Sequence, residues 1–253
     1  MKTVDLNCDL GEAFGAYTQL LAMDEQILPY ISSANIACGF HASDPVTMQK
    51  TVAAAVQAGV SLGAHPGLPD LVGFGRRTMA ISPQEAQTAI IYQVGALQAF
   101  ARAAGTTVHH VKPHGALYNM AAKDAELAHA ICRGVQACGK DLVLVALFGS
   151  EMVRAAQSMH LPYACEVFAD RAYQDDGTLV PRTQPGAVIT DEAEAVARSV
   201  RMVTHGVVTT VSGTDIPVQA DTICVHGDNP KALAFVQKIR AAFAEAHITI
   251  KHF

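Results

Sequence analysis

The chain lacks the sequence features of secreted and membrane-spanning proteins. Its six cysteines form no CxxC pair, and a chain this long and apolar needs no disulfide framework, so we expect reduced thiols in the cytoplasm. No apolar run approaches the roughly 20 residues that a transmembrane helix needs. The opening stretch MKTVDLNCDLGE reaches Asp5 and Asp9 before any apolar run, unlike a signal peptide.

Charge is also scarce. Only 16% of the residues are charged and 50% are hydrophobic, which is ample material for a buried core. The net charge of −5 and the pI near 6.1 argue against nucleic acid or an anionic membrane as the main partner. No Pro/Gly/Ser-rich or charged linker divides the 253 residues, so we expect a single domain spanning 1–253.

A Walker A motif is absent as well. The nearest glycine-rich piece, GFGRRT from Gly73, lacks the lysine and hydroxyl residue with which a phosphate-binding loop ends. We therefore expect any nucleotide to be bound in another way or by a partner protein.

A repeated strand-then-helix rhythm is the main positive signal. The expected strands, apolar and β-branched without clean alternation, are 3–6, 34–37, 60–64, about 108–111, 142–147, 163–167 and 222–225. Such strands are typical of parallel sheets that are buried on both faces. Charged or imidazole residues follow six of the seven strands, and a barrel brings all its strand ends to one mouth. The pattern favours an α/β fold with a closed β/α barrel over a Rossmann-like open sheet.

The segment VHHVKPHGALYN (108–119) contains the central strand, about 108–111, and the expected loop KPHGALYN that follows it. Pro113 cannot donate to a ladder and Gly115 permits positive φ, so Lys112 and His114 should project from the strand end. A lysine there can hold an oxyanion, and a histidine can move protons near neutral pH. A solvated lysine and a capping histidine are the plainer interpretation. His109 and His110 lie inside the strand, where a core histidine is more typical than a catalytic one.

Two further histidines, His41 and His65, each follow a strand. With Asp5 or Asp9 they could form a metal site of one aspartate and two histidines with an open position for water. No sequential metal motif such as HExxH supports this interpretation, and hydrogen bonding to a substrate is the alternative.

Arginines and acidic residues gather after the sixth strand and in the long loops. Arginine forks bind carboxylates and phosphates in a bidentate manner, so these loops suit an anionic substrate, although surface ion pairs are the plainer interpretation. The residues concerned are Glu166, Asp170, Arg171, Arg182, Arg76 and Arg77. Near the C-terminus, His226 and Asp228 in VHGDNP form a second imidazole and carboxylate pair.

These residues fall within six segments, DLNCDLGEAFG, ANIACGFHASDP, GAHPGLPDLVGFGRR, HVKPHGALYN, EVFADRAYQDDGTLVPR and CVHGDNP. In order and spacing they resemble the LamB/YcsF family, whose bacterial members are the A component of an ATP-hydrolysing 5-oxoprolinase. The resemblance extends from Asp5 to about Arg240. One departure is Ser43, where the family usually has glycine in HAGDP; we expect a serine to tolerate a normal helix N-cap there.

The resemblance implies an irregular seven-stranded β/α barrel of the glycoside hydrolase/deacetylase type. It also implies ATP-dependent opening of the lactam 5-oxoproline (pyroglutamate) to L-glutamate, together with 5-oxoprolinase subunits B and C. ATP is consumed in the reaction. A divalent cation such as Mg²⁺ is compatible with the predicted site residues. Assembly of several copies of the chain into a homo-oligomer is also compatible with the sequence. A lactam is an unactivated amide and reacts poorly with water. Phosphorylation of its oxygen by ATP makes the ring carbon a better electrophile for water to attack.

On this interpretation, Lys112 and Arg171 neutralise phosphate or the substrate carboxylate, and His114 or Asp170 is the general base. The residues expected to catalyse are Lys112, His114, Asp170 and Asp9. Those expected to bind or orient substrate, water or an ion are Asn7, His41, His65, Arg76, Tyr118, Asn119, Glu166, Arg171, Arg182, His226 and Asp228.

Two other functions stay open at this point. A metal-dependent deacetylase or related hydrolase acting on a carbohydrate would hold a divalent metal tightly and work without ATP. A non-catalytic accessory protein would present the cleft to its partners, and mutations at the mouth would leave the activity of the complex unchanged.

Overall fold

The computed structural model describes residues 2–13, 19–225 and 232–253. In this part of the chain, seven parallel strands form a closed ring, because β1 pairs with β2 on one side and with β9 on the other. Around the ring they are β1 (Lys2–Leu10), β2 (Ser33–Ala37), β3 (Ser61–His65), β4 (His110–Val111), β5 (Val143–Leu147), β6 (Tyr163–Phe168) and β9 (Thr222–Val225). The predicted β/α barrel is thus confirmed, and the open Rossmann-like sheet was the wrong alternative.

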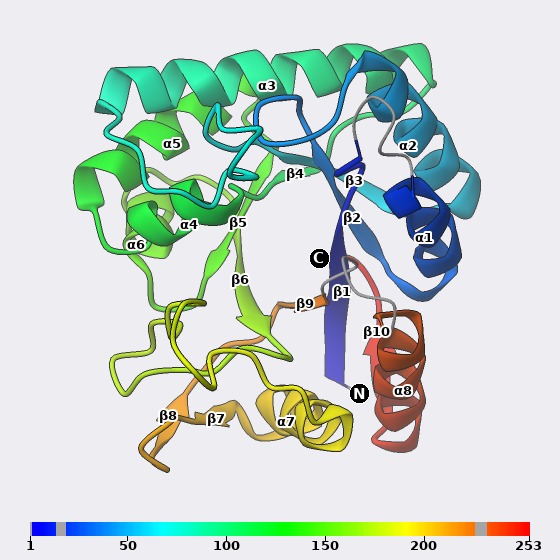
Figure 1. Cartoon of the computed structure of the whole chain (residues 1–253), viewed down its shortest axis with the longest axis vertical. Helices are drawn as coiled ribbons and strands as arrows, with labels where there is room; N and C mark the ends of the chain where they lie inside the picture. Colours follow the sequence, from blue (N-terminus) through cyan, green and yellow to red (C-terminus); the bar gives the residue numbers. More distant parts are fainter. Residues whose placement is uncertain (1, 14–18, 226–231) are drawn as a thin grey trace.

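Helices lie outside the ring of strands (Figure 1). They are α1 (Gln19–Ile27), a 3₁₀ turn η1 (Leu28–Tyr30), α2 (Pro45–Ala58), α3 (Pro83–Ala103), α4 (Gly115–Ala121), α5 (Ala125–Cys138), α6 (Glu151–Ser158), α7 (Glu192–His205) and α8 (Ala232–Glu245). A hairpin forms from β7 (Val207–Thr209) and β8 (Asp215–Pro217), and the terminal strand β10 (Ile248–Ile250) pairs with the start of β1. No described helix is long and apolar enough to cross a bilayer.

Local sequence signals set several helix ends. The Asp44 side chain accepts hydrogen bonds from the amides of Val46 and Thr47 and so caps α2, which ends at Gly59 in the left-handed conformation. Ser82 and Glu85 form a capping box at the start of α3.

One local expectation was wrong. The segment after Pro113 is not a loop, because α4 begins at Gly115 and buries Leu117 and Ala121 against the core. Ser43 leaves the normal N-cap at Asp44 in place, as expected, but Ser43 itself has φ of +79°, the left-handed region that favours glycine.

The interior of the barrel is polar, which the sequence pattern did not predict. Along β1, apolar and polar residues alternate from Val4 to Leu10, and side chains on a strand point alternately to its two faces. The apolar set belongs to the core beneath the helices, whereas Asp5, Asn7 and Asp9 share the other face and reach side chains of neighbouring strands. Gly63 of β3 leaves room in this interior for the His110 side chain, because a Cβ at position 63 would lie only 2.0 Å from His110 Nε2.

Candidate active site

The three polar residues of β1 mark successive levels of the barrel interior. Asp5, at the lower level, accepts hydrogen bonds from the hydroxyls of Ser32 (2.6 Å), Ser33 (2.7 Å) and Thr222 (2.5 Å). Burial raises its pKa and these hydroxyls oppose the rise. Both oxygens of Asp5 are therefore hydrogen-bonded to hydroxyl groups of the lower level. Of the two aspartates predicted to accompany His41 and His65, only Asp9 lies near them.

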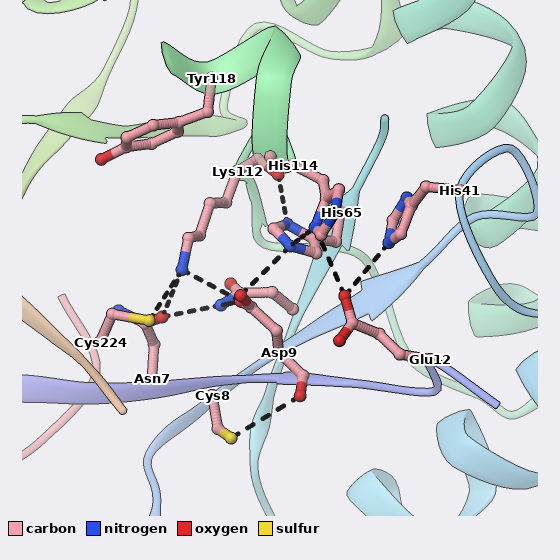
Figure 2. Close-up of polar contacts among 12 residues, drawn as sticks. Asn7, Cys8, Asp9, Glu12, His41, His65, Lys112, His114, Tyr118 and Cys224 are labelled. Atoms are coloured by element: carbon pink, nitrogen blue, oxygen red, sulfur yellow. Dashed lines mark hydrogen bonds and ion pairs between the residues drawn. The ribbon is translucent and has the colours of Figure 1, made fainter. Parts of the chain in front are cut away.

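Lys112 occupies the middle of the barrel, where its ammonium is surrounded by acceptors (Figure 2). Its Nζ lies 3.0 Å from Asp9 Oδ1, 2.8 Å from Glu166 Oε1 and 3.1 Å from Asn7 Oδ1. Burial alone would lower the pKa of this lysine, but Asp9, the Cys224 thiol and Glu166 outweigh it and raise the pKa well above its usual value. Lys112 is therefore a fixed cation with only 3% of its surface exposed.

Glu166 joins Lys112 to the opposite wall of the barrel. Its Oε2 accepts a hydrogen bond from the Tyr118 hydroxyl at 2.7 Å, and its Oε1 accepts one from Asn7 Nδ2 at 3.1 Å. Burial, with Glu166 alongside, raises the pKa of Tyr118 well above its usual value, so the phenol keeps its proton as the donor. A lysine, a glutamate and a tyrosine from three separate segments thus form one buried network.

A second cluster, of Glu12, His41, His65 and His114, lies beside Asp9 at the carboxyl ends of the strands (Figure 2). Glu12 Oε1 lies 3.2 Å from His41 Nε2 and 3.4 Å from His114 Nδ1, while His65 Nε2 lies 3.0 Å from His114 Nδ1. One ligand atom from each of the four residues lies within 4.8 Å of every other, so this buried group could hold a metal ion.

The histidine rings are closely packed. His41 and His114 stack with ring centroids 3.7 Å apart and an interplanar angle of 2°, and His65 meets both nearly at right angles. Gly75, with φ of +62°, makes room for them, because a Cβ there would lie 2.7 Å from His41 Cβ. Burial, reinforced by the neighbouring imidazoles, lowers the pKa of His41 and His114 well below the usual histidine value.

Above these networks is a cavity of about 610 Å³. Asp9, Glu12 and His114 reach it from the barrel interior. Cationic residues of three loops also line it: Arg76, Lys123, Arg171 and Arg182. Tyr118 and Asn119 contribute from α4.

The structure brings most of the predicted residues to this end of the barrel. Asn7, His41, His65, Lys112 and Glu166 lie beneath the cavity in the networks described above. Asp170 does not line the cavity. The guanidinium of Arg171 donates to the carbonyls of Val180 (2.6 Å) and Ala187 (3.3 Å), which fixes it within its own loop. His226 and Asp228 lie outside the described residues.

A protein family model and individual proteins of known name match almost the whole chain. The LamB/YcsF family model matches residues 4–253. The chain belongs to the LamB/YcsF family. It is 59% identical over 250 residues to the A component of 5-oxoprolinase from Brevibacillus brevis, with 99% of this chain and 98% of that protein covered. It is 58% identical over 250 residues to the corresponding protein of Clostridium beijerinckii, covering 99% and 97%.

A solved structure agrees with this assignment. The lactam utilization protein from Thermus thermophilus superposes with a TM-score of 0.93 at 45% identity, and the match covers 99% of this chain and 100% of that one. The LamB/YcsF motifs quoted from the sequence are therefore the segments that supply the site: DLNCDLGE carries Asn7, Asp9 and Glu12, and HVKPHGALYN carries Lys112, His114 and Tyr118.

Glu12 is the residue that the sequence pattern did not single out. It follows Asp5, Asn7 and Asp9 of β1 in the sequence, but no role was predicted for it. The sequence feature that could have indicated it is its position just past the strand end. β1 ends at Leu10, and Gly11, with φ of +69°, turns the chain so that Glu12 can reach His41 and His114. The direction of such a turn becomes apparent only in the folded chain.

Proposed function

We propose that this chain carries the site at which the lactam ring of 5-oxoproline is opened to L-glutamate at the expense of ATP. Its relatives named as the A component of 5-oxoprolinase and the lactam utilization protein support the substrate class. The observation that carries the proposal is the cavity itself, because it combines a cationic rim with a floor of carboxylates and an imidazole.

The rim suits an anionic substrate. Arg76, Lys123 and Arg182 reach the cavity from three separate segments, and guanidinium groups bind carboxylates and phosphates through paired hydrogen bonds. Both 5-oxoproline and a phosphorylated intermediate carry such groups. The rim is thus proposed to orient the substrate carboxylate and any transferred phosphate.

The floor suits the activation of water. Asp9 Oδ1 lies 3.0 Å from the Lys112 ammonium and accepts a hydrogen bond from Asn35 Nδ2 at 2.8 Å. We assign the activation of water to Asp9, whose Oδ2 lies 3.3 Å from His65 Nε2. This assignment changes the role predicted for Lys112: since Lys112 is buried beneath the cavity, it acts through Asp9 and Glu166 and does not bind phosphate itself.

The proposal retains ATP, Mg²⁺ and partner subunits B and C. Transfer of the γ-phosphoryl group to the lactam oxygen makes the ring carbon electrophilic. With ADP released, water attacks that carbon, the ring C–N bond breaks as its nitrogen takes up a proton, and γ-glutamyl phosphate forms. A second water hydrolyses this acyl phosphate to glutamate and inorganic phosphate. Mg²⁺ accompanies the ATP phosphates. All six cysteines are free thiols, which fits a reducing cytoplasm where ATP is available.

The test is glutamate release from 5-oxoproline and ATP by this chain alone, by the B and C subunits alone, and by the mixture. We expect glutamate only from the complete mixture. Glutamate from B and C alone would make this chain an accessory protein. If no mixture yields glutamate, the carbohydrate deacetylase is the function to assay next.

A rim variant locates the site within the mixture. Arg76→Gln together with Arg182→Gln should raise the KM for 5-oxoproline by about tenfold, because two cations that face the substrate are lost. Arg154→Gln is the matched control, since Arg154 is an exposed arginine of α6 that pairs with Glu151 away from the cavity. Equal KM values in both variants would place the substrate elsewhere.

A further inference from the structure

We infer that His65, His114, Glu12 and Asp9 bind one divalent transition-metal ion of the Zn²⁺ type at the floor of the cavity. The inference goes beyond the proposed function, and it is tested without any substrate. It rests on where the imidazole protons must lie, on the spacing of the ligand atoms and on the orientation of the rings.

Backbone carbonyls determine which nitrogen of each imidazole carries the proton. His65 Nδ1 lies 2.7 Å from the Lys112 carbonyl oxygen, and His114 Nε2 lies 2.8 Å from the Phe74 carbonyl oxygen. A carbonyl oxygen only accepts, so both of these nitrogens are donors. In the neutral rings, His65 Nε2 and His114 Nδ1 therefore carry lone pairs, and these two atoms lie 3.0 Å apart. Two facing lone pairs repel each other, and either a proton on one ring or a metal ion between the two nitrogens relieves the repulsion.

This arrangement is the one that metal-binding histidines adopt. A ligating histidine usually donates its other ring N–H to a backbone carbonyl or a carboxylate, which fixes both its tautomer and its orientation. Here both rings are fixed in this way before any ion is considered.

Two carboxylate oxygens complete the set. Glu12 Oε1 lies 3.4 Å from His114 Nδ1, and Asp9 Oδ2 lies 3.3 Å from His65 Nε2. Ligand atoms bound tetrahedrally at roughly 2.1 Å from an ion are about 3.4 Å from one another. The three observed separations of 3.0 to 3.4 Å thus match three of the six edges that four such ligands would define.

His41 belongs to the support of the site. Because its ring is parallel to that of His114 at a centroid distance of 3.7 Å, one ion cannot lie in the planes of both rings. His41 Nε2 instead donates to Glu12 Oε1 at 3.2 Å (Figure 2). The remaining His41 Nδ1 is buried with no hydrogen-bond partner in the described part of the chain, which is less costly for a bare lone pair than for an N–H group.

The ligand set also selects the kind of ion. Imidazole and carboxylate together suit Zn²⁺, Co²⁺, Mn²⁺ or Fe²⁺, whereas Mg²⁺ and Ca²⁺ prefer oxygen ligands alone. Asp9, Glu12 and His114 line the cavity, so an ion among them has a side open to it. With four protein ligands in place, a water or a carbonyl oxygen would take a fifth position on the cavity side, where the ion would lower the pKa of the water or polarise the carbonyl.

The experiment is metal binding by the full chain. The protein is stripped with a chelator and dialysed separately against Zn²⁺, Co²⁺ and Mg²⁺, and bound metal is measured by mass spectrometry. We expect one equivalent of Zn²⁺ or Co²⁺, no stoichiometric Mg²⁺, and a higher Tm with Zn²⁺ than without it. The Co²⁺ form should show the weak visible bands of nitrogen and oxygen ligands.

Three variants and a control locate the ion. Glu12→Gln and His114→Gln should each weaken Zn²⁺ binding by about a hundredfold, and His41→Phe, which keeps the ring stack but loses the donor to Glu12, by about tenfold. His129→Gln should bind like the wild type, since His129 is a partly exposed histidine of α5 that does not belong to the cluster. Circular dichroism of each metal-free variant verifies its fold. Glu12→Gln and His114→Gln each test the site independently, so one of them suffices if the other does not fold.

The inference is overturned if the wild type binds no stoichiometric Zn²⁺ or Co²⁺, or if Mg²⁺ binds equally well. It is also overturned if folded Glu12→Gln or His114→Gln binds Zn²⁺ as the wild type does. A strong near-ultraviolet thiolate band in the Co²⁺ form would assign the ion to a cysteine and would likewise contradict it. None of these results depends on glutamate formation, so failure here and failure of the proposed function are separate outcomes.

Discussion

Two aspartates four residues apart on β1 have opposite surroundings. Asp5, in the lower layer of the barrel interior, is fully buried and accepts hydrogen bonds from three hydroxyl groups. Asp9, in the upper layer, contacts the Lys112 ammonium, the His65 imidazole and the Asn35 amide, and its side chain is 15% exposed at the cavity.

The difference shows that residue type alone does not assign function inside this barrel. Both carboxylates lie on the same face of the same strand, and strands β2, β3, β4 and β9 decide what each one meets. Hydroxyl partners stabilise the fold and leave nothing for a substrate to contact. A charged partner and an open side give a group whose protonation can change during a reaction. The predictions below test this division between a structural lower layer and a functional upper layer.

The largest effect is expected from Lys112→Met. Removing the ammonium leaves the carboxylates of Asp9 and Glu166 without their cation, so turnover in the complete 5-oxoprolinase assay should fall by about a hundredfold to a thousandfold. Stability should fall as well, by about 3 kcal/mol or more, because an unpaired buried charge is costly. Urea unfolding and the glutamate assay measure the two effects.

A double variant separates these two effects. In Lys112→Met with Glu166→Gln, one of the two unpaired charges is gone, so part of the lost stability should return while turnover stays low. Recovery of turnover along with stability would mean that Lys112 serves only the fold.

A pair of tyrosines offers a smaller contrast. Tyr118→Phe removes the hydrogen bond to the buried Glu166 carboxylate and should lower turnover about tenfold, with a loss of stability of about 1 to 3 kcal/mol. In Tyr173→Phe, the amide of Phe168 loses its buried acceptor, the Tyr173 hydroxyl, so stability should fall by about 1 to 3 kcal/mol while turnover per folded molecule is retained. Full turnover in Tyr118→Phe together with reduced turnover in Tyr173→Phe would contradict the assignment of Tyr118 to the functional layer.

The smallest effect is expected at Ser43, which is strained by its φ of +79°. Ser43→Gly should leave turnover unchanged and stabilise the fold by up to about 1 kcal/mol, measured as a higher midpoint of urea unfolding. Ser82→Gly is the control, because Ser82 has an ordinary φ of −74° and caps α3, so that variant should be slightly destabilised. A lower midpoint for Ser43→Gly would contradict the strain.

Much of the fold was predictable because it follows from local chemistry. Caps such as Asp44 and Ser82 mark helix starts by their own hydrogen bonds, and apolar β-branched runs mark the buried strands. The α4 helix was missed because Pro113 and Gly115 are typical of loops. Here they only end β4, and the buried side chains that follow favour a helix.

The site was predictable only as a collection of residues. Strand ends identified Asp9, His41, His65, Lys112 and His114, but not which of them contact one another. Closure of the ring decides that, since Asn7 meets Thr222 and Glu166 from strands far away in the sequence. For the same reason the polar lower layer around Asp5 could not be distinguished from the site until strand register was known.

The most direct test compares Asp9→Asn with Asp5→Asn in the complete 5-oxoprolinase assay, at a temperature where both variants are folded. We predict that Asp9→Asn lowers turnover at least about a hundredfold. Asp5→Asn should stay within about threefold of the wild type and lose stability instead, since an amide nitrogen would replace one acceptor of the hydroxyl groups. Equal turnover in the two variants would contradict the assignment of the upper layer as the active site.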